Sequence, residues 1–257
     1  MRANLVEVFS SVQGEGPDVG ASTLFVRLGG CDLRCAWCDS VHTWRPAPVC
    51  RLEEARGSGR FRELPNPVAL AEVVAAARAL DAEHHRMVSL TGGEPLLQAD
   101  ATAELARELG ALGPEVLLET HGLHAEGLRR VLPHLDVVSM DWKLASDVRR
   151  AADPAGAAPE PFHDAHEAFL GVARDAPRVV VKLVITPASR DAEVDEAVRR
   201  VARTHAGVIL VLQPVTPCGA VTARPPAARM LALAARAEAL LADVRVIPQT
   251  HPIYGAP

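Results

Sequence analysis

Residues 23–38 of the chain read TLFVRLGGCDLRCAWC, a strand-like apolar run that leads directly into a loop with three cysteines. Cys31, Cys35 and Cys38 offer three soft thiolate ligands from one short segment. Iron–sulfur cubanes are held by cysteine thiolates and normally use four of them. A loop that supplies only three leaves one iron open to bind another molecule, which indicates a catalytic cluster.

A structural zinc site is the alternative interpretation of these cysteines, with His42 or Cys50 as the fourth ligand, because zinc sites combine Cys and His in similar clusters. Zinc ligands usually come as two CxxC pairs, and the sequence has no second pair. The spacing therefore favours iron and sulfur. Cys50 and Cys218 are interpreted as ordinary free thiols in a reducing compartment.

Length and composition indicate one globular domain. The chain has 257 residues, of which 49% are hydrophobic, and a formal net charge of −5. The sequence has no basic run and only 4% aromatic residues, so a nucleic acid is not expected as a partner. No long apolar stretch indicates a signal peptide or a membrane span. We therefore expect a cytoplasmic protein that does not bind membranes.

Apolar runs of five or six residues alternate with helix-like patterns along the chain, which predicts repeated βα units on a parallel sheet. The predicted fold is α/β, a partial parallel (βα) barrel of about six strands in a single domain over residues 1–257. Residues 5–9 form an N-terminal extension, predicted outside the main sheet. Strands are predicted at residues 23–28, 87–91, 115–119, 136–140, 179–185, 208–213 and 244–248. Helices are predicted at residues 67–82, 100–110, 123–131, 163–173, 191–204 and 226–242.

Two segments interrupt this alternation. Residues 44–66, rich in Arg, Pro and Gly, and residues 145–161, rich in Ala, Asp and Pro, are both interpreted as surface excursions. Asn66 and Pro67 are predicted as the N-cap and first residue of the first helix. Six histidines are assigned to solvated helix surfaces: His84, His85, His134, His163, His166 and His205.

Unusual polar residues follow the predicted strands at their carboxyl ends. Parallel βα folds gather their chemistry at this edge, because the loops there converge on one mouth. The two glycines of TGGEP let backbone approach a ligand closely, and Glu94 or a carbonyl could accept from an ammonium group. Besides the cysteine loop, these segments are TGGEP at 91–95, ETHG at 119–122, SMDWK at 139–143, QPV at 213–215 and QTH at 249–251.

The N-terminal stretch FSSVQGEG, at residues 9–16, offers a different set of groups. Gln13 and Glu15 suit the guanidine-like edge of a heterocycle, and Arg27 suits a carboxylate through bidentate hydrogen bonds. Taken alone, the stretch could equally be a glycine-rich turn with a surface acid.

The CxxxCxxC spacing resembles the signature of the radical S-adenosylmethionine (SAM) superfamily, and TGGEP resembles its GGEP motif. These motifs, combined with QGEG, Arg27 and the C-terminal QTHPIYGAP, make the chain similar to the 7-carboxy-7-deazaguanine synthase family. This resemblance implies conversion of 6-carboxy-5,6,7,8-tetrahydropterin to 7-carboxy-7-deazaguanine with loss of ammonia, in a deazapurine pathway such as that to queuosine. It also implies SAM that is regenerated, an external one-electron reductant and a homodimer.

The same resemblance implies residue roles. Cys31, Cys35 and Cys38 would ligate a [4Fe-4S] cluster, and Ser40 would supply a hydroxyl to Mg²⁺, a metal that prefers oxygen ligands. Residues implied around SAM are Trp37, Cys38, Asp39, Gly93, Ser139, Asp141 and Gln213. Residues implied to hold the substrate are Val12, Gln13, Gly14, Glu15, Arg27, Thr91 and Pro257, the last through its carboxylate.

Three positions depart from the family pattern. Family members often carry Thr at Ser40, Asn at His121, and Ser-Pro-Lys in place of the segment at residues 139–143. Two other functions are considered: an activating enzyme that places a radical on a glycine of a partner protein, and a non-enzymatic iron–sulfur module with four protein ligands. The first would not need QGEG or Arg27, and the second would need a fourth ligand such as His42 or Cys50.

Overall fold

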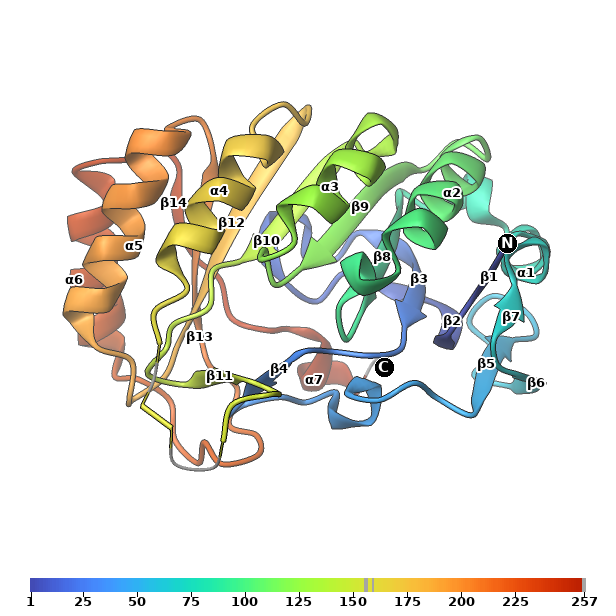
Figure 1. The fold of residues 1–257 in the computed structure, drawn as a ribbon, viewed down its shortest axis with the longest axis horizontal. Helices are drawn as coiled ribbons and strands as arrows, with labels where there is room; N and C mark the ends of the chain where they lie inside the picture. Colours follow the sequence, from blue (N-terminus) through green and yellow to red (C-terminus); the bar gives the residue numbers. More distant parts are fainter. Residues whose placement is uncertain (155–156, 159, 256–257) are drawn as a thin grey trace.

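The computed structural model describes residues 1–154, 157–158 and 160–255. Its centre is a ten-stranded sheet in the order β14-β13-β12-β10-β9-β8-β3-β2-β5-β6 (Figure 1). The seven strands from β14 to β3 are mutually parallel, which confirms the predicted α/β fold, and they correspond to the seven predicted strand ranges. These strands are β3 (Ser22–Leu28), β8 (Met87–Gly92), β9 (Glu115–Thr120), β10 (Val137–Asp141), β12 (Arg178–Ile185), β13 (Ile209–Pro214) and β14 (Val244–Val246).

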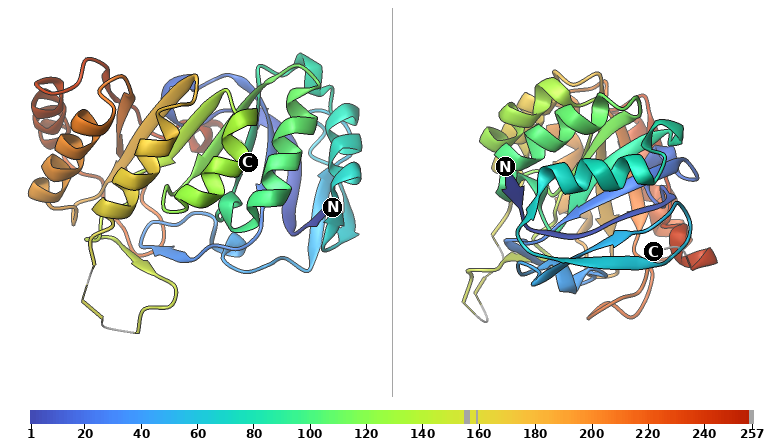
Figure 2. Two further views of the ribbon diagram at one scale, coloured as in Figure 1. Left: turned by 45° about the horizontal axis from the view of Figure 1, so that its top comes forward. Right: turned by 90° about the vertical axis from the view of Figure 1, so that its right-hand side faces the viewer.

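Helices α1 to α6 lie side by side on one face of the sheet, each in contact with the next (Figures 1 and 2). Their apolar stripes bury Leu105, Phe169 and Val198 against the sheet, because burial removes apolar surface from water. All six coincide closely with predicted helices. They are α1 (Leu70–Ala79), α2 (Ala99–Gly110), α3 (Ala125–Val131), α4 (His163–Ala173), α5 (Asp191–Thr204) and α6 (Ala227–Glu238).

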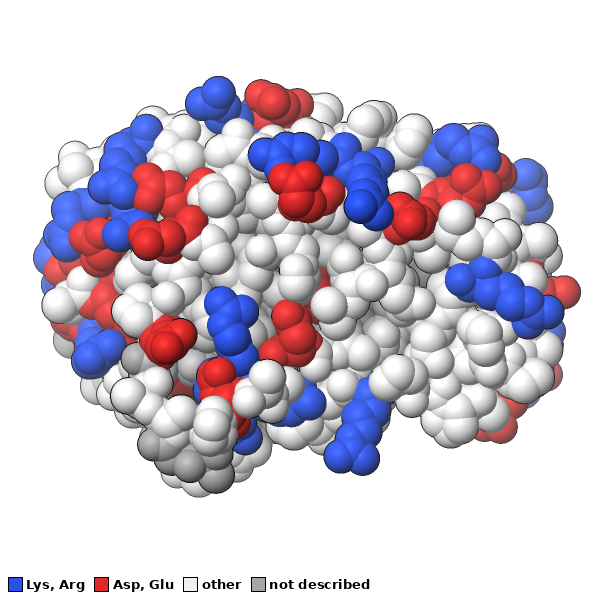
Figure 3. Space-filling view, viewed as in Figure 1, with Lys and Arg blue, Asp and Glu red and all other residues white. Residues whose placement is uncertain are grey.

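Acidic and basic side chains are interleaved over the helices (Figure 3), as in the contacts of Arg200 and Arg203 with Glu167. No described helix is both long and apolar enough to cross a membrane. Short elements make up the rest of the described secondary structure besides the strands introduced below. They include β1 (Arg2–Ala3), β4 (Leu33–Cys35), β7 (Val68–Ala69), β11 (Val148–Arg150), α7 (His251–Tyr254) and the 3-10 turns η1 (Gly16–Asp18), η2 (Val41–Thr43), η3 (Ala82–His84), η4 (Pro95–Gln98) and η5 (Leu132–His134).

The N-terminal strand belongs to the main sheet, so the prediction that it lies outside is wrong. Strand β2 (Leu5–Val12) pairs antiparallel with β3 and parallel with β5. Leu5 and Val8 are fully buried in the core, which explains why the strand is retained there. Its first residues lie beside the carboxyl end of β3, where Glu7 pairs with Arg27, and Val12 pairs with Ser22 at the amino end.

The segment at residues 44–66 also extends the sheet, and its interpretation as a surface excursion is wrong. It forms β5 (Val49–Glu53) and β6 (Phe61–Pro65), with Cys50 and Leu52 fully buried. Asn66 is not a helix N-cap. Its side-chain amide bonds both the N–H and the carbonyl of Leu5, and the first helix begins only at Leu70.

The second interrupting segment, at residues 145–161, has a structural role in its first part. Strand β11 pairs antiparallel with β4, which carries Cys35, so this segment holds the cysteine loop. Residues 155–156 and 159 lie outside the described residues.

Two of the six histidines assigned to solvated surfaces are buried, which corrects that assignment. His166 is fully buried; its Nδ1 donates to the carbonyl of Gly122 at 2.9 Å, and its Nε2 accepts from the N–H of Lys143 at 2.9 Å. Burial lowers the pKa of His166 to about 3, so the ring is neutral. His85 is buried as well, with Nε2 3.1 Å from the Leu80 carbonyl. A sequence pattern does not reveal such backbone partners.

Candidate active site

A cavity of about 660 Å³ opens at the carboxyl ends of the parallel strands. This volume suits a small-molecule site. Pro257 lies outside the described residues. The other residues predicted for the site all line the cavity: Val12, Gln13, Gly14, Glu15, Arg27, Cys31, Cys35, Trp37, Cys38, Asp39, Ser40, Thr91, Gly93, Ser139, Asp141 and Gln213.

The cysteine loop forms one wall of this cavity. Cys31, Cys35 and Cys38 are free and partly exposed. The loop is anchored by Leu33, which packs in a small apolar cluster with Val148 and others. Trp44, a residue that sequence reasoning did not single out, donates from Nε1 to Cys38 Sγ at 3.2 Å.

These thiols fit an iron–sulfur cluster with three protein ligands. Burial raises the pKa of Cys31, and it raises that of Cys35 to about 11, so both are protonated thiols until a metal displaces the protons. Cys50 lies within the apolar core on β5 and does not line the cavity, which contradicts its role as a fourth ligand. His42 does line the cavity.

The TGGEP segment places backbone, rather than its acid, at the cavity. A side chain on Gly93 would collide with the carbonyl of Gly30 and with Cys31, so only glycine allows this approach. Glu94 is fully buried and does not line the cavity. Its carboxylate accepts from Thr120 Oγ1 at 2.8 Å and from the N–H of His121 at 2.9 Å, so the idea that it accepts from a ligand ammonium is wrong.

Four charged side chains form a network in the cavity. The ammonium of Lys182 contacts the carboxylate of Glu15 and lies 3.6 Å from Asp141 Oδ2, and Lys143 Nζ donates to the same oxygen at 2.6 Å. Burial alone would raise the pKa of Asp141 and Glu15, but the neighbouring ammonium groups outweigh it and lower both pKa values. The reciprocal effect raises the pKa of both lysines despite their burial. All four groups are therefore charged at neutral pH.

Two buried side-chain oxygens of residues that line this cavity are left without a partner. Within the described part of the chain, Asp141 Oδ1 and Gln213 Oε1 are buried and make no hydrogen bond. Buried polar atoms are almost always hydrogen-bonded in native structures. The two oxygens therefore suit a bound molecule that carries hydroxyl or ammonium donors, such as SAM.

The polar side chains of the N-terminal segment, which were predicted to hold a heterocycle and a carboxylate, also contact side chains of the protein. Gln13 donates to Glu119 Oε1 at 2.8 Å, whereas Glu15 contacts Lys182 and Gln249. Arg27 Nε donates to Glu7 Oε1 at 3.0 Å. Within the described residues its two terminal nitrogens make no hydrogen bond, so they remain available for a carboxylate.

Sequence reasoning missed Glu7 and Lys182, and it quoted Glu119 and Lys143 without assigning them a role. Lys182 had a usable signal, since it is the only charged residue in the apolar run VVVKLVI at 179–185. A buried strand in a parallel sheet normally reads as continuously apolar, so a lysine inside it points to a polar cavity. Glu7 carried no comparable signal because its strand was misplaced.

The C-terminal segment closes over the N-terminal loop. The N–H of Thr250 donates to the carbonyl of Gly14 at 2.9 Å. A side chain on Gly14 would collide with His251, which itself lines the cavity. Ser40 Oγ donates to Asp39 Oδ1 at 2.9 Å, and Gln249 of the C-terminal segment donates to Asp39 Oδ2 at 3.2 Å, so hydroxyl and carboxylate oxygens stand together beside this segment.

An α/β fold that presents three open thiols beside a glycine-rich strand end defines a radical SAM protein, and the family model described as the radical SAM superfamily matches residues 25–201. 7-Carboxy-7-deazaguanine synthase from Geobacter sulfurreducens is 36% identical, over 98% of this chain and 97% of that protein. The synthase from Archaeoglobus fulgidus is 31% identical over 99% of each chain. The chain belongs to the 7-carboxy-7-deazaguanine synthase family.

A solved structure agrees with this placement at the level of the fold. The crystal structure of QueE from Escherichia coli superimposes with a TM-score of 0.63, at 22% sequence identity. The match covers 98% of this chain and 95% of the other. The sheet and helix layer described above are therefore shared with that structure.

Proposed function

We propose that this chain is a radical SAM enzyme that converts 6-carboxy-5,6,7,8-tetrahydropterin to 7-carboxy-7-deazaguanine with loss of ammonia, as a carbon–nitrogen lyase of queuosine-type biosynthesis. Residues 1–257 would act as one radical SAM domain. The observation that carries the proposal is a single cavity lined both by three free cysteines and by the QGEG segment with Arg27. Membership of the synthase family supports it.

Cys31, Cys35 and Cys38 would hold a [4Fe-4S] cluster, which together with SAM would supply a 5′-deoxyadenosyl radical. Asp141 and Gln213 offer their unpartnered oxygens to donors on SAM. Gly93, Ser139 and the residues from Trp37 to Asp39 complete this part of the lining. The main work of these groups is to position SAM, because orientation of reacting groups lowers a barrier substantially.

The substrate would lie toward the N-terminal segment. Arg27 would pair with the pterin carboxylate through its free terminal nitrogens, while its Nε donates to Glu7 and so holds the guanidinium in place. Gln13, Glu15 and Thr91 would hold the heterocycle, with Val12 and Gly14 forming the adjacent wall. The carboxylate of Pro257 is proposed to complete this pocket.

Mg²⁺ is proposed at Ser40. The Ser40 hydroxyl and the Asp39 carboxylate are hard oxygen donors, and Mg²⁺ keeps several waters or substrate oxygens in addition to few protein ligands. An external one-electron reductant, a cytoplasmic location and a homodimeric state complete the proposal. The family comparison does not favour an activating enzyme for glycyl radicals or a non-enzymatic iron–sulfur module.

The test is made on anaerobically reconstituted protein with SAM, dithionite, Mg²⁺ and 6-carboxytetrahydropterin. Mass spectrometry should detect 7-carboxy-7-deazaguanine without stoichiometric 5′-deoxyadenosine. Arg27→Gln should lose most of the product, whereas Arg78→Gln on the exposed side of α1 should not. Accumulation of 5′-deoxyadenosine without any deazapurine would instead mean a radical SAM enzyme with another substrate.

A further inference from the structure

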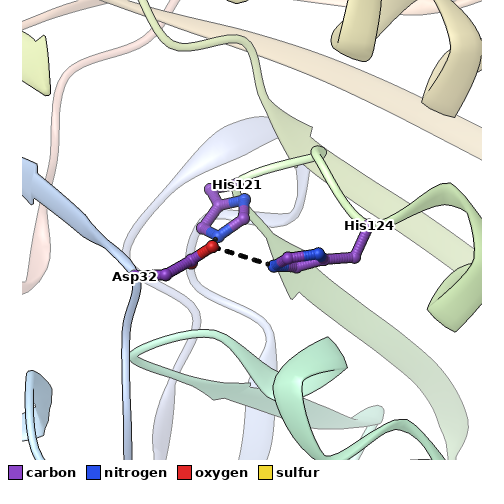
Figure 4. A group of neighbouring side chains, drawn as sticks. All are labelled: Asp32, His121 and His124. Atoms are coloured by element: carbon purple, nitrogen blue, oxygen red, sulfur yellow. Dashed lines mark hydrogen bonds and ion pairs between the residues drawn. The ribbon is translucent and has the colours of Figure 1, made fainter. Parts of the chain in front are cut away.

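Asp32, His121 and His124 bring one carboxylate and two imidazoles together (Figure 4). Asp32 Oδ1 lies 2.8 Å from His121 Nε2, and Asp32 Oδ2 lies 3.2 Å from His124 Nε2. The three ligand atoms all lie within 4.8 Å of one another. None of the three residues has a role in the reaction proposed above.

Hydrogen bonding does not fully account for this group. His121 is buried, with 4% of its side chain exposed. His124 Nε2 is a buried atom that makes no hydrogen bond within the described part of the chain, although it lies close to the Asp32 carboxylate. Asp32 and His121 make one hydrogen bond, which a bound cation would replace, whereas His124 Nε2 faces the second oxygen of Asp32 without hydrogen-bond alignment. A cation shared by the three groups would satisfy this second nitrogen as well.

Two imidazoles and one carboxylate are the donors that bind Zn²⁺ or Fe²⁺ while leaving coordination positions open, and they do not suit Mg²⁺. We propose that Asp32, His121 and His124 form a second metal site that binds one divalent transition-metal ion of the zinc or iron(II) type. Its donor atoms are distinct from the three cysteine thiols and from the Ser40 hydroxyl, although Asp32 itself lies within the cysteine loop. It does not depend on which substrate the cavity takes.

The surroundings of the site support this assignment. Glu94 is fully buried, and it fixes the backbone of His121 by accepting from its N–H at 2.9 Å. Glu94 Oε2 also lies 3.3 Å from His121 Nε2, the nitrogen that faces Asp32, so a second carboxylate oxygen stands beside the proposed ligands. A second cavity, of about 680 Å³, is lined by His124, Leu97 and Arg130. An ion can thus reach the site from a side other than the catalytic cavity, which His121 lines.

A bound ion would cross-link two segments that the chain keeps far apart. Asp32 lies between the cluster cysteines Cys31 and Cys35, whereas His121 and His124 follow β9 and precede α3. The ion would therefore clamp the cysteine loop onto the end of β9. Its role would be structural, since Asp32 directly follows Cys31 and holding it would fix the position of the cysteine loop.

The test uses holoprotein with its iron–sulfur cluster already reconstituted, so that the cysteines are not free to take zinc. After equilibrium dialysis against Zn²⁺, the metal content should show one zinc per chain in addition to the cluster iron. His124→Asn should lose the zinc and keep the iron, and Asn is a favourable residue at the start of α3. The matched control is His84→Ala, in the exposed group Asp81, Glu83 and His84, which should keep the zinc.

Anomalous diffraction at the zinc edge decides the location in the unaltered protein, independently of any variant. A peak between Asp32 and the two imidazoles is expected. Zinc retained in His124→Asn, a peak at Asp81 to His84 only, or no zinc bound by the unaltered holoprotein would each overturn the proposal.

Discussion

The helix-covered face of the sheet and its carboxyl-end edge follow opposite rules. Under the helices, Leu105 and Phe169 are fully buried among other apolar side chains, and their packing needs no particular partner. At the edge, Lys182 and Asp141 are largely buried charges, and Asp141 Oδ1 has no hydrogen-bond partner in the described chain. The first region is complete without a ligand, whereas the second is arranged for molecules still to be bound. Substitutions in the two regions should therefore have separable effects.

Replacement of a cluster cysteine should separate the regions most strongly. Cys35→Ser should abolish deazapurine formation and reduce the iron bound per chain, because the remaining two thiolates cannot hold the cluster. The free energy of unfolding of the metal-free protein should change little, since Cys35 is partly exposed and packs only at the margin of the small apolar cluster around Leu33. Product assays, iron content and urea denaturation measure the three quantities. A large loss of stability in the metal-free variant would show that the loop belongs to the core instead.

Loss of Lys182 should be the largest stability effect at the edge. Lys182→Met leaves Glu15 and Asp141 buried without their shared ammonium group. Removing one partner of a buried ion pair typically costs about 3–5 kcal/mol of unfolding free energy. Denaturant unfolding at pH 7 measures this change. Ala substitution of exposed Arg245, which pairs with Asp243, is the control and should have little effect.

The helix-covered face should respond in stability alone. Leu105→Ala removes a fully buried side chain from α2 and should cost about 2–5 kcal/mol through lost burial and a residual cavity. At temperatures where the variant stays folded, its kcat/KM should match that of the unaltered protein. A fall in kcat/KM with retained stability would contradict the independence of the two regions.

The sequence predicted these two regions unequally, for a physical reason. Strands and helices of the covered face follow from apolar periodicity, which is local, and all seven parallel strands coincide with predictions. The pairing of Lys182 with Glu15 joins residues 167 positions apart, so no local pattern contains it. Strand β2 was misplaced because antiparallel addition to β3 is a tertiary choice. The residues that line the cavity were predictable because strand ends and family motifs coincide there. The hydrogen bonds and ion pairs among these residues were not predictable.

The loss of unfolding free energy caused by Lys182→Met should depend on pH, and the direction of this dependence separates the charged edge from the apolar core. In the unaltered protein the ammonium groups lower the pKa of Asp141 and Glu15, so their stabilisation is present above the unfolded pKa of about 4 and is lost as pH falls through the folded pKa. Without Lys182, burial should raise the pKa of Glu15, whereas Asp141 keeps the ammonium group of Lys143. The destabilisation should therefore shrink as pH falls from 7 toward 5 and Glu15 takes up a proton. Each unit of restored pKa difference corresponds to about 1.4 kcal/mol. Burial of neutral His166 affects both proteins equally and cancels in the difference.

The smallest effect is expected where a local backbone rule alone applies. Asp81, exposed between α1 and η3, has a φ of 55°, in the left-handed region that costs side-chain-bearing residues about 1–2 kcal/mol, and less for Asp. Asp81→Gly removes this cost but adds about 0.5–1 kcal/mol of backbone entropy to the unfolded chain. A net gain below about 1 kcal/mol in unfolding free energy is expected from these opposing terms, with kcat/KM unchanged. Thermal unfolding and the product assay measure both, and a clear destabilisation would mean that the Asp81 carboxylate holds a partner that matters to the fold.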